Sequence, residues 1–348
     1  MNTLIRKLIL GCITAAPALG LSTAAFAQTP KATPAPPALP APKQKLPIAA
    51  PRFPMYTGGE TYERSIVVDP NITLSLCVVQ GTLRVNGWNR NEARIFVKDG
   101  SRVAFKVREK GPKDNRPVWV EAIGDSPTKA VKAFPGCLWG DQIEIDLPVG
   151  SAVEIKGQET KTSIDNIKRL AIRNVGGDIS VRNISGRITA ATFQGDILVE
   201  ESEGDISLET TTGNIVAFEV GPGASGDAFK AKSNSGMITM HSLRHRQIEA
   251  GSISGSLMFT GEIRDAGSYV LNTSNGSIKL ALPAKTACMV AATYSSGNFM
   301  SELPLKILTE DYKENMGRFK SITARLGTGG DALLKLTTNN GSIGIRKQ

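Results

Sequence analysis

A glycine returns every nine residues, without a break, in the segment that begins at residue 177. The glycines of this register are Gly177, Gly186, Gly195, Gly204 and Gly213. An isoleucine stands two residues after each glycine, and Val, Ala or Leu follows two residues later. Side chains two residues apart share one face of a strand, so each unit predicts a short strand with two buried side chains. The glycine predicts a turn, because it adopts backbone conformations that other residues avoid.

Units this short cannot bury their apolar face alone, so the repeat predicts a stack of coils. Two nine-residue units would form one flattened coil, with the apolar side chains pointing inward from both sides. The motif then continues at wider spacing, at Gly236, Gly255, Gly276, Gly297 and Gly341. We therefore expect an all-β chain, a β-solenoid (flattened β-helix or β-roll) with coils of about 18–22 residues, in which each coil pairs with the coils before and after it. An earlier copy at Gly81 indicates that the N-terminal half joins this stack.

The segment before the repeat contains short aliphatic runs and one clear alternation, Arg102–Arg108. Its apolar residues would face one side of a strand, and Arg102, Lys106 and Arg108 would face the other. These three residues form a candidate face for an anionic ligand, and a solvated strand face is the simpler interpretation. We predict one β-solenoid domain over residues 59–348, with a less regular part at 59–160 and Gly-x-Ile repeats at 161–348.

The N-terminus has the layout of a secretory signal peptide over residues 1–27. Arg6 and Lys7 precede an apolar run, and Ala25-Phe-Ala27 forms a small-x-small cleavage site. A lipoprotein signal ending at Cys12 and an uncleaved anchor are alternatives, but the apolar stretch before Cys12 is short and Pro17 interrupts the run. We expect an exported protein, in the periplasm or at the cell surface.

Residues 28–58 form a linker rich in Pro, Ala and Lys, with nine prolines between Thr29 and Pro54. Proline removes backbone donors and favours an extended conformation, so this segment predicts a disordered or semi-rigid tether. Three cysteines follow the signal, and an oxidising compartment permits a disulfide among them. Cys77 and Cys137 are the preferred pair, because both lie in the N-terminal half; buried free thiols are the alternative.

The order of the motifs resembles the bacterial candidate-adhesin β-strand repeat domains of unknown function, which are related to the head domains of auto-transporter adhesins. The residues that carry the resemblance are the Gly-Asp-Ile runs at Gly177, Gly195 and Gly204, Thr273–Leu280, Leu282-Pro283, Ser295–Phe299, Ser301–Pro304 and Thr338–Ile343. The resemblance extends from about Ile66 to the end of the chain. It implies a right-handed β-solenoid on the envelope or surface, and it brings no catalytic residues.

The candidate metal ligands favour structural roles. His241 and His245 are the only histidines. Four residues of strand span about 13 Å, too far for a shared ion, so solvent-facing histidines are the better interpretation. Asp178, Asp196 and Asp205 follow their glycines directly, unlike the aspartates of calcium-binding β-rolls, and Asp suits turns by bonding its own backbone. We expect no metal and no cofactor.

The candidate catalytic and sugar-binding residues likewise form no recognisable site in the sequence. Several acids crowd one region and no pair stands out: Glu200, Glu201, Glu203, Glu209 and Glu219. These glutamates are more simply interpreted as a solvated face than as the catalytic pair of a glycosidase. Trp88, Trp119 and Trp139 could stack on sugars, but such residues more often fill or cap a core.

Composition leaves three classes of function open. The net charge is +9, and removal of Arg6 and Lys7 leaves 9 − 2 = +7. This excess suits envelope glycan or anionic lipid, and export argues against nucleic acid. The leading hypothesis is a non-enzymatic envelope or surface scaffold, an adhesin-like binding module. The alternatives are an envelope sensor that binds another protein and a polysaccharide-acting enzyme on a β-helix.

Overall fold

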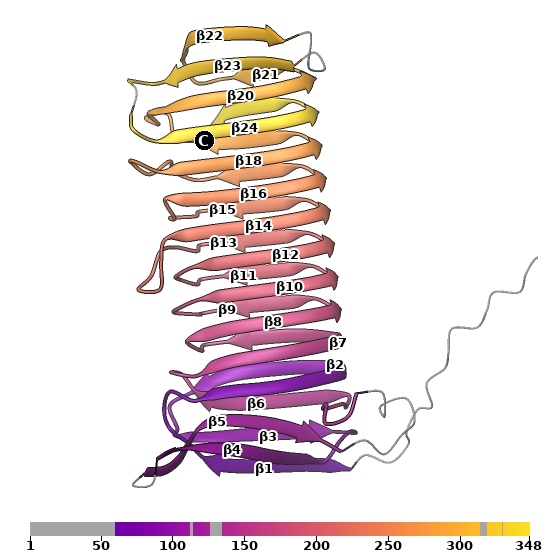
Figure 1. The fold of residues 1–348 in the computed structure, drawn as a ribbon. Coiled ribbons are helices and arrows are strands. Elements are labelled where there is room, and N and C mark those ends of the chain that lie inside the picture. Colours follow the sequence, from indigo (N-terminus) through magenta and orange to yellow (C-terminus); the bar gives the residue numbers. More distant parts are fainter. Residues whose placement is uncertain (1–59, 112–113, 126–133, 314–318, 329) are drawn as a thin grey trace, which may run out of the picture. The chain divides into compact units, whose positions relative to one another are not determined.

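The computed structural model describes residues 60–111, 114–125, 134–313, 319–328 and 330–348. These residues form strands, turns and loops, with no helix among them, and they belong to a compact unit that spans Met55–Gln348 (Figure 1). The all-β prediction is confirmed. No helix in the described ranges is long and apolar enough to cross a membrane. The predicted signal peptide and linker lie outside the described residues.

The nine-residue register builds two parallel sheet faces. One face contains β8 (Arg169–Gly176), β10 (Ile188–Gln194), β12 (Ile206–Thr212), β14 (Ala228–Ser235), β16 (Gln247–Ser254) and β18 (Ser268–Asn275). The other face contains β9 (Ile179–Arg182), β11 (Ile197–Glu200), β13 (Ile215–Phe218), β15 (Ile238–His241), β17 (Leu257–Thr260) and β19 (Ile278–Leu282). Ile188 pairs with Ile206, and Ile197 pairs with Ile215, so each coil contains two of the predicted units.

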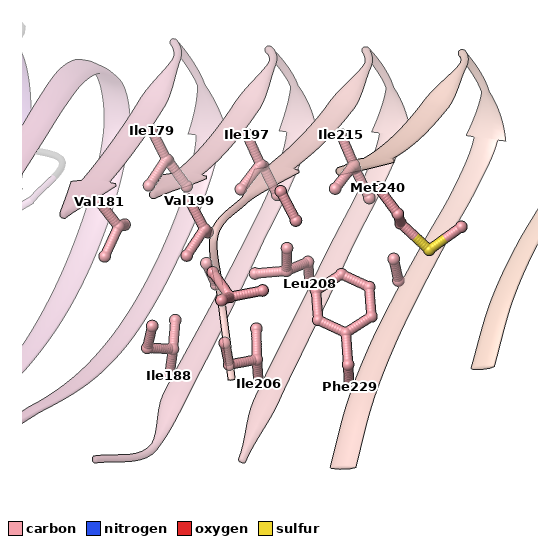
Figure 2. Close-up of a cluster of buried hydrophobic side chains, with 14 of the residues drawn as sticks. Ile179, Val181, Ile188, Ile197, Val199, Ile206, Leu208, Ile215, Phe229 and Met240 are labelled. Carbon is pink, nitrogen blue, oxygen red and sulfur yellow. The ribbon is translucent and has the colours of Figure 1, made fainter. Parts of the chain in front are cut away.

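The apolar positions of the repeat meet between the two faces. Ile179 and Val181 point inward from β9, and Ile188 and Leu208 point inward from the opposite face (Figure 2). All four side chains are at most 1% exposed. Where the coil length first changes, the fully buried Phe229 takes the position that pairs with Ile206. The predicted two-sided core is therefore present.

The C-terminal coils are not stacked in sequence order, which corrects the expected pairing of each coil with its chain neighbours. The last coil, β24 (Leu333–Asn340) and β25 (Ile343–Lys347), lies between two earlier coils. β18 pairs with β24, and β24 pairs with β20 (Cys288–Ser296). On the other face, β19 pairs with β25, and β25 pairs with β21 (Phe299–Ser301). Chain order could not show this insertion, because all three coils carry the same Gly-x-apolar pattern.

The N-terminal part joins the stack through two long parallel strands that bend across both faces. β2 (Thr73–Trp88) pairs with β7 (Ala152–Asp165) over nearly their whole lengths. The remaining strands are β1 (Thr61–Val67), β3 (Glu92–Lys98), β4 (Val103–Gly111), β5 (Asp114–Gly124) and β6 (Gln142–Pro148). β1 pairs with β3, β3 with β6 and β4 with β5, all antiparallel. This antiparallel arrangement is the physical basis of the less regular sequence.

Antiparallel strands also close the other end. β23 (Phe319–Leu326) pairs with β20, and β22 (Leu305–Lys313) pairs with β23. The N-terminal part carries the disulfide: the structure joins Cys77 to Cys137 with an S–S distance of 2.03 Å, the pair preferred from the sequence. Cys288 is a buried free thiol in β20.

Candidate functional site

The predicted turn glycines lie at the two corners of the coil. We name the corner with Gly177, Gly195 and Gly213 the regular corner, and the corner with Gly186 and Gly204 the less regular corner. From Gly195 onward, each glycine of the regular corner lies directly over the carbonyl of the glycine in the adjacent coil: a Cβ on Gly195 would lie 2.3 Å from the Gly177 oxygen, and one on Gly213 would lie 2.0 Å from the Gly195 oxygen. Gly341 stands over Gly276 in the same way. The predicted structural role therefore rests on close backbone approach, a constraint that only glycine meets.

A row of hydroxyl groups supports the regular corner, and sequence reasoning missed it. Thr210 Oγ1 donates to the Gly195 carbonyl at 3.0 Å, Ser233 Oγ to Gly213 at 3.1 Å, and Thr338 Oγ1 to Gly276 at 2.8 Å. Each Ser or Thr stands three residues before a corner glycine of its own coil. That spacing was a readable signal, because a buried hydroxyl needs a fixed acceptor.

The corner aspartates Asp178 and Asp196 accept hydrogen bonds from backbone N–H groups of the adjacent coil. Asp178 accepts a hydrogen bond from the Asp196 backbone N–H at 3.0 Å, and Asp196 accepts one from the Asn214 N–H at 2.7 Å. Asp205 lies at the other corner and pairs with Arg187 at 3.3 Å. Within the described ranges, no three His, Cys, Asp or Glu side chains form a group that could hold a metal.

The two histidines lie in different environments, and the interpretation of both as solvent-facing is wrong for His245. His241 stacks on Phe218 of the adjacent coil, with ring centroids 5.1 Å apart. His245 is fully buried, its Nε2 lies 2.8 Å from the Gly204 carbonyl oxygen, and its Nδ1 has no partner among the described atoms. Burial lowers the pKa of His245, and the hydrogen bond to Gly204 and the charge of Asp227 only partly oppose this effect. The ring therefore favours the neutral form.

Acidification is expected to destabilise the protein through His245. The unfolded chain binds the proton with a pKa of about 6.5, whereas the folded state binds it less readily. The free energy of unfolding should thus fall below pH of about 6.5, with a slope of at most ~1.4 kcal/mol per pH unit. Urea titrations at neutral and mildly acidic pH measure this slope. His245→Gln should reduce this slope; a variant with the slope of the wild type would contradict the assignment.

Two residues of the predicted basic face, Lys106 and Arg108, lie on β4, and Arg102 directly precedes this strand. Lys106 lies 3.7 Å from Glu121 of β5, and both side chains are well exposed. The Arg108 guanidinium lies over the Trp119 ring at 5.6 Å, and that of Arg102 lies over Tyr62 at 5.5 Å. A ring contact uses the flat face of the guanidinium and leaves its edge N–H donors directed sideways. One of these donors is engaged in Arg102, whose Nε donates to the Tyr62 hydroxyl at 3.3 Å. The face thus presents three cations, two of them held in position by aromatic rings.

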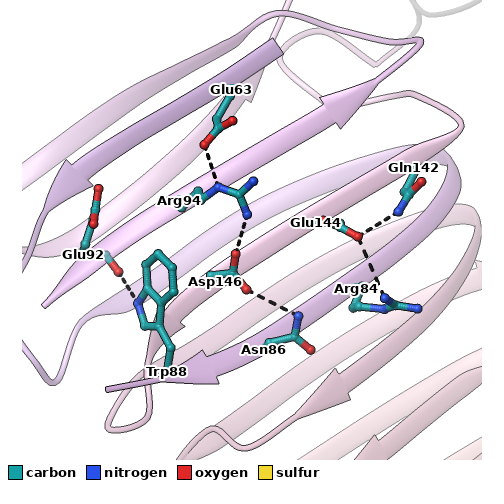
Figure 3. A network of polar contacts seen from close by, with 9 residues as sticks. All are labelled: Glu63, Arg84, Asn86, Trp88, Glu92, Arg94, Gln142, Glu144 and Asp146. Carbon is teal, nitrogen blue, oxygen red and sulfur yellow. Dashed lines mark hydrogen bonds and ion pairs between the residues drawn. The ribbon is translucent and has the colours of Figure 1, made fainter. Parts of the chain in front are cut away.

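The guanidinium of Arg94, in contrast to those of Arg102 and Arg108, bonds carboxylates on two neighbouring strands. The Arg94 guanidinium donates to Glu63 at 2.7 Å and to Asp146 at 2.8 Å, which connects β1, β3 and β6 (Figure 3). These hydrogen bonds raise the pKa of Arg94. Trp88 donates its indole N–H to the Glu92 carbonyl in the same region. Arg94 and Trp88 therefore connect parts of the fold to one another. Trp139 does the same, because its indole N–H donates to the Asp125 carbonyl.

A groove of about 810 Å³ runs along the less regular corner. Four residues that line this groove each directly follow a strand of one sheet face and have a left-handed backbone, with φ between 46° and 55°. They are Asn183, Glu201, Glu219 and Ser242. Glu203 and Arg244 also line the groove and pair at 3.6 Å. The structure thus brings together Glu201, Glu203 and Glu219, whereas Glu200 and Glu209 lie outside the groove. No sequence pattern distinguished these three glutamates from Glu200 and Glu209.

The free cysteine has the environment of a packing residue. Cys288 is completely buried in β20, and burial raises the pKa of its thiol to about 11. A protonated, inaccessible thiol is a poor nucleophile. Cys288 therefore acts as a small apolar side chain.

A family model described as Toastrack DUF4097 matches residues 119–247 and 223–346. No curated protein matches the chain. Three crystal structures are similar at low identity. A candidate cell adhesion protein from Clostridium sporogenes has 10% identity, covers 83% of this chain and 100% of its own, and has a TM-score of 0.26. A candidate adhesin from Bacteroides fragilis has 12% identity, coverage of 83% and 97%, and a TM-score of 0.36. A candidate adhesin from Parabacteroides distasonis has 9% identity, coverage of 82% and 97%, and a TM-score of 0.32.

Proposed function

The chain belongs to the Toastrack DUF4097 family, and we propose that it is an exported, non-enzymatic scaffold that binds anionic envelope material through the basic face of β4. The repeated residues support a scaffold role, because the core and the corners use them. The exported location is supported by the signal-like N-terminus and by the Cys77–Cys137 disulfide, since disulfides persist in oxidising compartments.

The arrangement of Arg102, Lys106 and Arg108 is the single observation that carries the proposal. Lys106 and Arg108 belong to β4 and Arg102 directly precedes it, and the guanidinium groups of Arg102 and Arg108 each lie over an aromatic ring. Stacking reduces the conformational freedom that an arginine loses when it binds, so the edge donors are prepared for carboxylate or phosphate oxygens. Lys106 adds positive charge between them, opposed by the exposed Glu121.

Neutralising this face is expected to weaken binding to anionic surfaces. Each basic residue near an anionic membrane contributes about 1 kcal/mol, so Arg102→Gln, Lys106→Gln and Arg108→Gln together should weaken binding roughly 100-fold. Retention of residues 28–348 on vesicles with phosphatidylglycerol, on neutral vesicles and on an immobilised anionic polysaccharide measures the effect at two salt concentrations. The comparison also separates lipid from glycan as the source of the anion.

The matched control removes the same charge elsewhere. Lys161, Lys168 and Arg173 are exposed on the regular coils, and their triple change to Gln should leave binding within about 3-fold of wild type. If both triple variants bind equally, general positive charge is responsible and the β4 face is not the site. Retention by a protein alone would instead favour an envelope sensor.

The corner groove favours a second candidate function, action on a polysaccharide. Glycosidases place two carboxylates on opposite sides of a bound sugar, and Glu201, Glu203 and Glu219 line one groove here. Release of reducing ends from envelope polysaccharide, lost in Glu203→Gln, would establish this function and overturn the non-enzymatic scaffold.

A further inference from the structure

The strand β22 closes one sheet face at the C-terminal end of the stack (Figure 1). Among the described residues it pairs only with β23, so one of its backbone edges has no strand beside it. An unpaired strand edge is a ready site for pairing with another chain, unless charge or proline blocks it.

The register of β22 against β23 shows which side chains face the core side. Ile307 lies opposite the buried Ala324, and Glu310 lies opposite the buried Ile322. Residues directly opposite each other in an antiparallel pair share a sheet face. Ile307 and Glu310 therefore face the core side, and Tyr312, two residues beyond Glu310, does so as well. Leu308 is the extra residue of a bulge between them.

Within the described ranges, no strand lies over this core-side face of β22. The opposite sheet ends with β21, which is only three residues long. As a result Ile307 is 54% exposed, Leu308 44% and Tyr312 52%. Three large exposed apolar side chains thus lie within six residues at the end of the stack, where a continued solenoid would place another coil. We name Ile307, Leu308 and Tyr312 the end patch.

The N-terminal end of the stack has a different character. There the terminal strand β4 carries Lys106, Arg108 and Lys110, and positively charged side chains on an edge strand oppose further pairing. Lys110 also pairs with Asp69 at 3.2 Å. The charges of β22 are of both signs (Lys306, Glu310 and Asp311), whereas the side chains of β4 are mainly positive, so β22 can complement the charges of a second β22. The end patch therefore matches itself better than it matches the opposite end.

We propose that two copies of this chain associate tail to tail, with the end patch of each copy packed on that of the other around a two-fold axis. A two-fold interface requires a surface that is its own complement. The end patch meets this condition: the exposed Glu310 lies on the same face, as does the exposed Lys320, which is opposite Tyr312 in β23. Apolar side chains would meet at the axis, with Glu310 directed toward the partner's Lys320.

A lysine in the patch should separate the two copies. Sedimentation of the exported form, residues 28–348, is expected to show a reversible dimer whose population rises with concentration. Ile307→Lys would bury an unpaired charge in the interface and should raise the dimer Kd at least about 100-fold. Phe193→Lys is the matched control, because Phe193 is also 54% exposed but lies on β10 in the middle of the stack; it should leave the Kd unchanged. Circular dichroism and unfolding midpoints check that both variants remain folded.

A charge exchange tests the orientation of the two copies. Glu310→Lys and Lys320→Glu should each weaken the dimer roughly 10-fold, and the double variant should recover most of the affinity, because it restores the opposite pair. A wild type that is monomeric at all concentrations would overturn the proposal, as would a dimer that survives Ile307→Lys. Assemblies that grow beyond the dimer would indicate head-to-tail stacking and would also overturn it.

Discussion

Gly213→Ala is expected to unfold the protein at much lower urea concentration than wild type, with a loss of about 4 kcal/mol in the free energy of unfolding. Two effects add. The backbone φ of Gly213 is 151°, which an alanine adopts only under strain, and the new Cβ would lie 2.0 Å from the Gly195 carbonyl oxygen. Backbone forms both sides of this contact, so no side chain can move away to relieve it.

Gly251→Ala is the control for this experiment. Gly251 lies inside β16, its φ is not positive, and its added Cβ would meet nothing closer than the Asn272 oxygen at 3.7 Å. The change should alter stability by less than about 1 kcal/mol, since alanine there mainly restricts the unfolded chain. Equal urea midpoints for the two variants would show that the corner does not depend on close backbone approach.

Leu336→Asp is expected to open the entire C-terminal end of the stack and not the last coil alone. Leu336 is completely buried in β24, and an unpaired carboxylate there should cost at least about 4 kcal/mol. Because β24 and β25 connect β20 and β21 to β18 and β19, their loss removes the attachment of the coils beyond them.

Hydrogen exchange distinguishes this arrangement from stacking in chain order. In Leu336→Asp, amide protection should fall in β20, β21, β22 and β23 as well as in β24 and β25, while β8 to β12 retain theirs. If the coils were stacked in chain order, β24 and β25 would be terminal, and β20 to β23 would remain protected. Lys335→Asp is the control: the neighbouring Lys335 is exposed on the outer face, so the protection pattern should stay that of the wild type.

Much of the candidate surface could be predicted because it depends on alternation alone. Arg102, Lys106 and Arg108 follow the two-residue period of a strand, and their common face follows from that period. Their stacking on Tyr62 and Trp119 could not be predicted, because those rings come from other strands. The corner groove was equally hidden: Glu201 and Glu219 lie 18 residues apart, and only the stacking of coils brings them to one side.

The burial of His245 could not be predicted from the local sequence either. Its neighbours Arg244 and Arg246 are polar, and nothing local marks the position as internal. The chain turns its corner there, and the ring enters the core beside Phe229 at 6.0 Å. Corners break the two-residue period, so alternation cannot assign an inside and an outside to them.

The sequence by itself determined the all-β class, the two-stranded coil and the inward face of every strand from Ile179 to Ala217. Each of these follows from local backbone geometry, namely the glycine turn and the alternation of side chains. Only the tertiary structure decided which coil lies against which. Gly276, Gly297 and Gly341 begin nearly identical units, so any order would satisfy the local pattern. The pairing of the last coil between two earlier ones depends on contacts between distant segments, and those contacts also place β22 at the end of the stack.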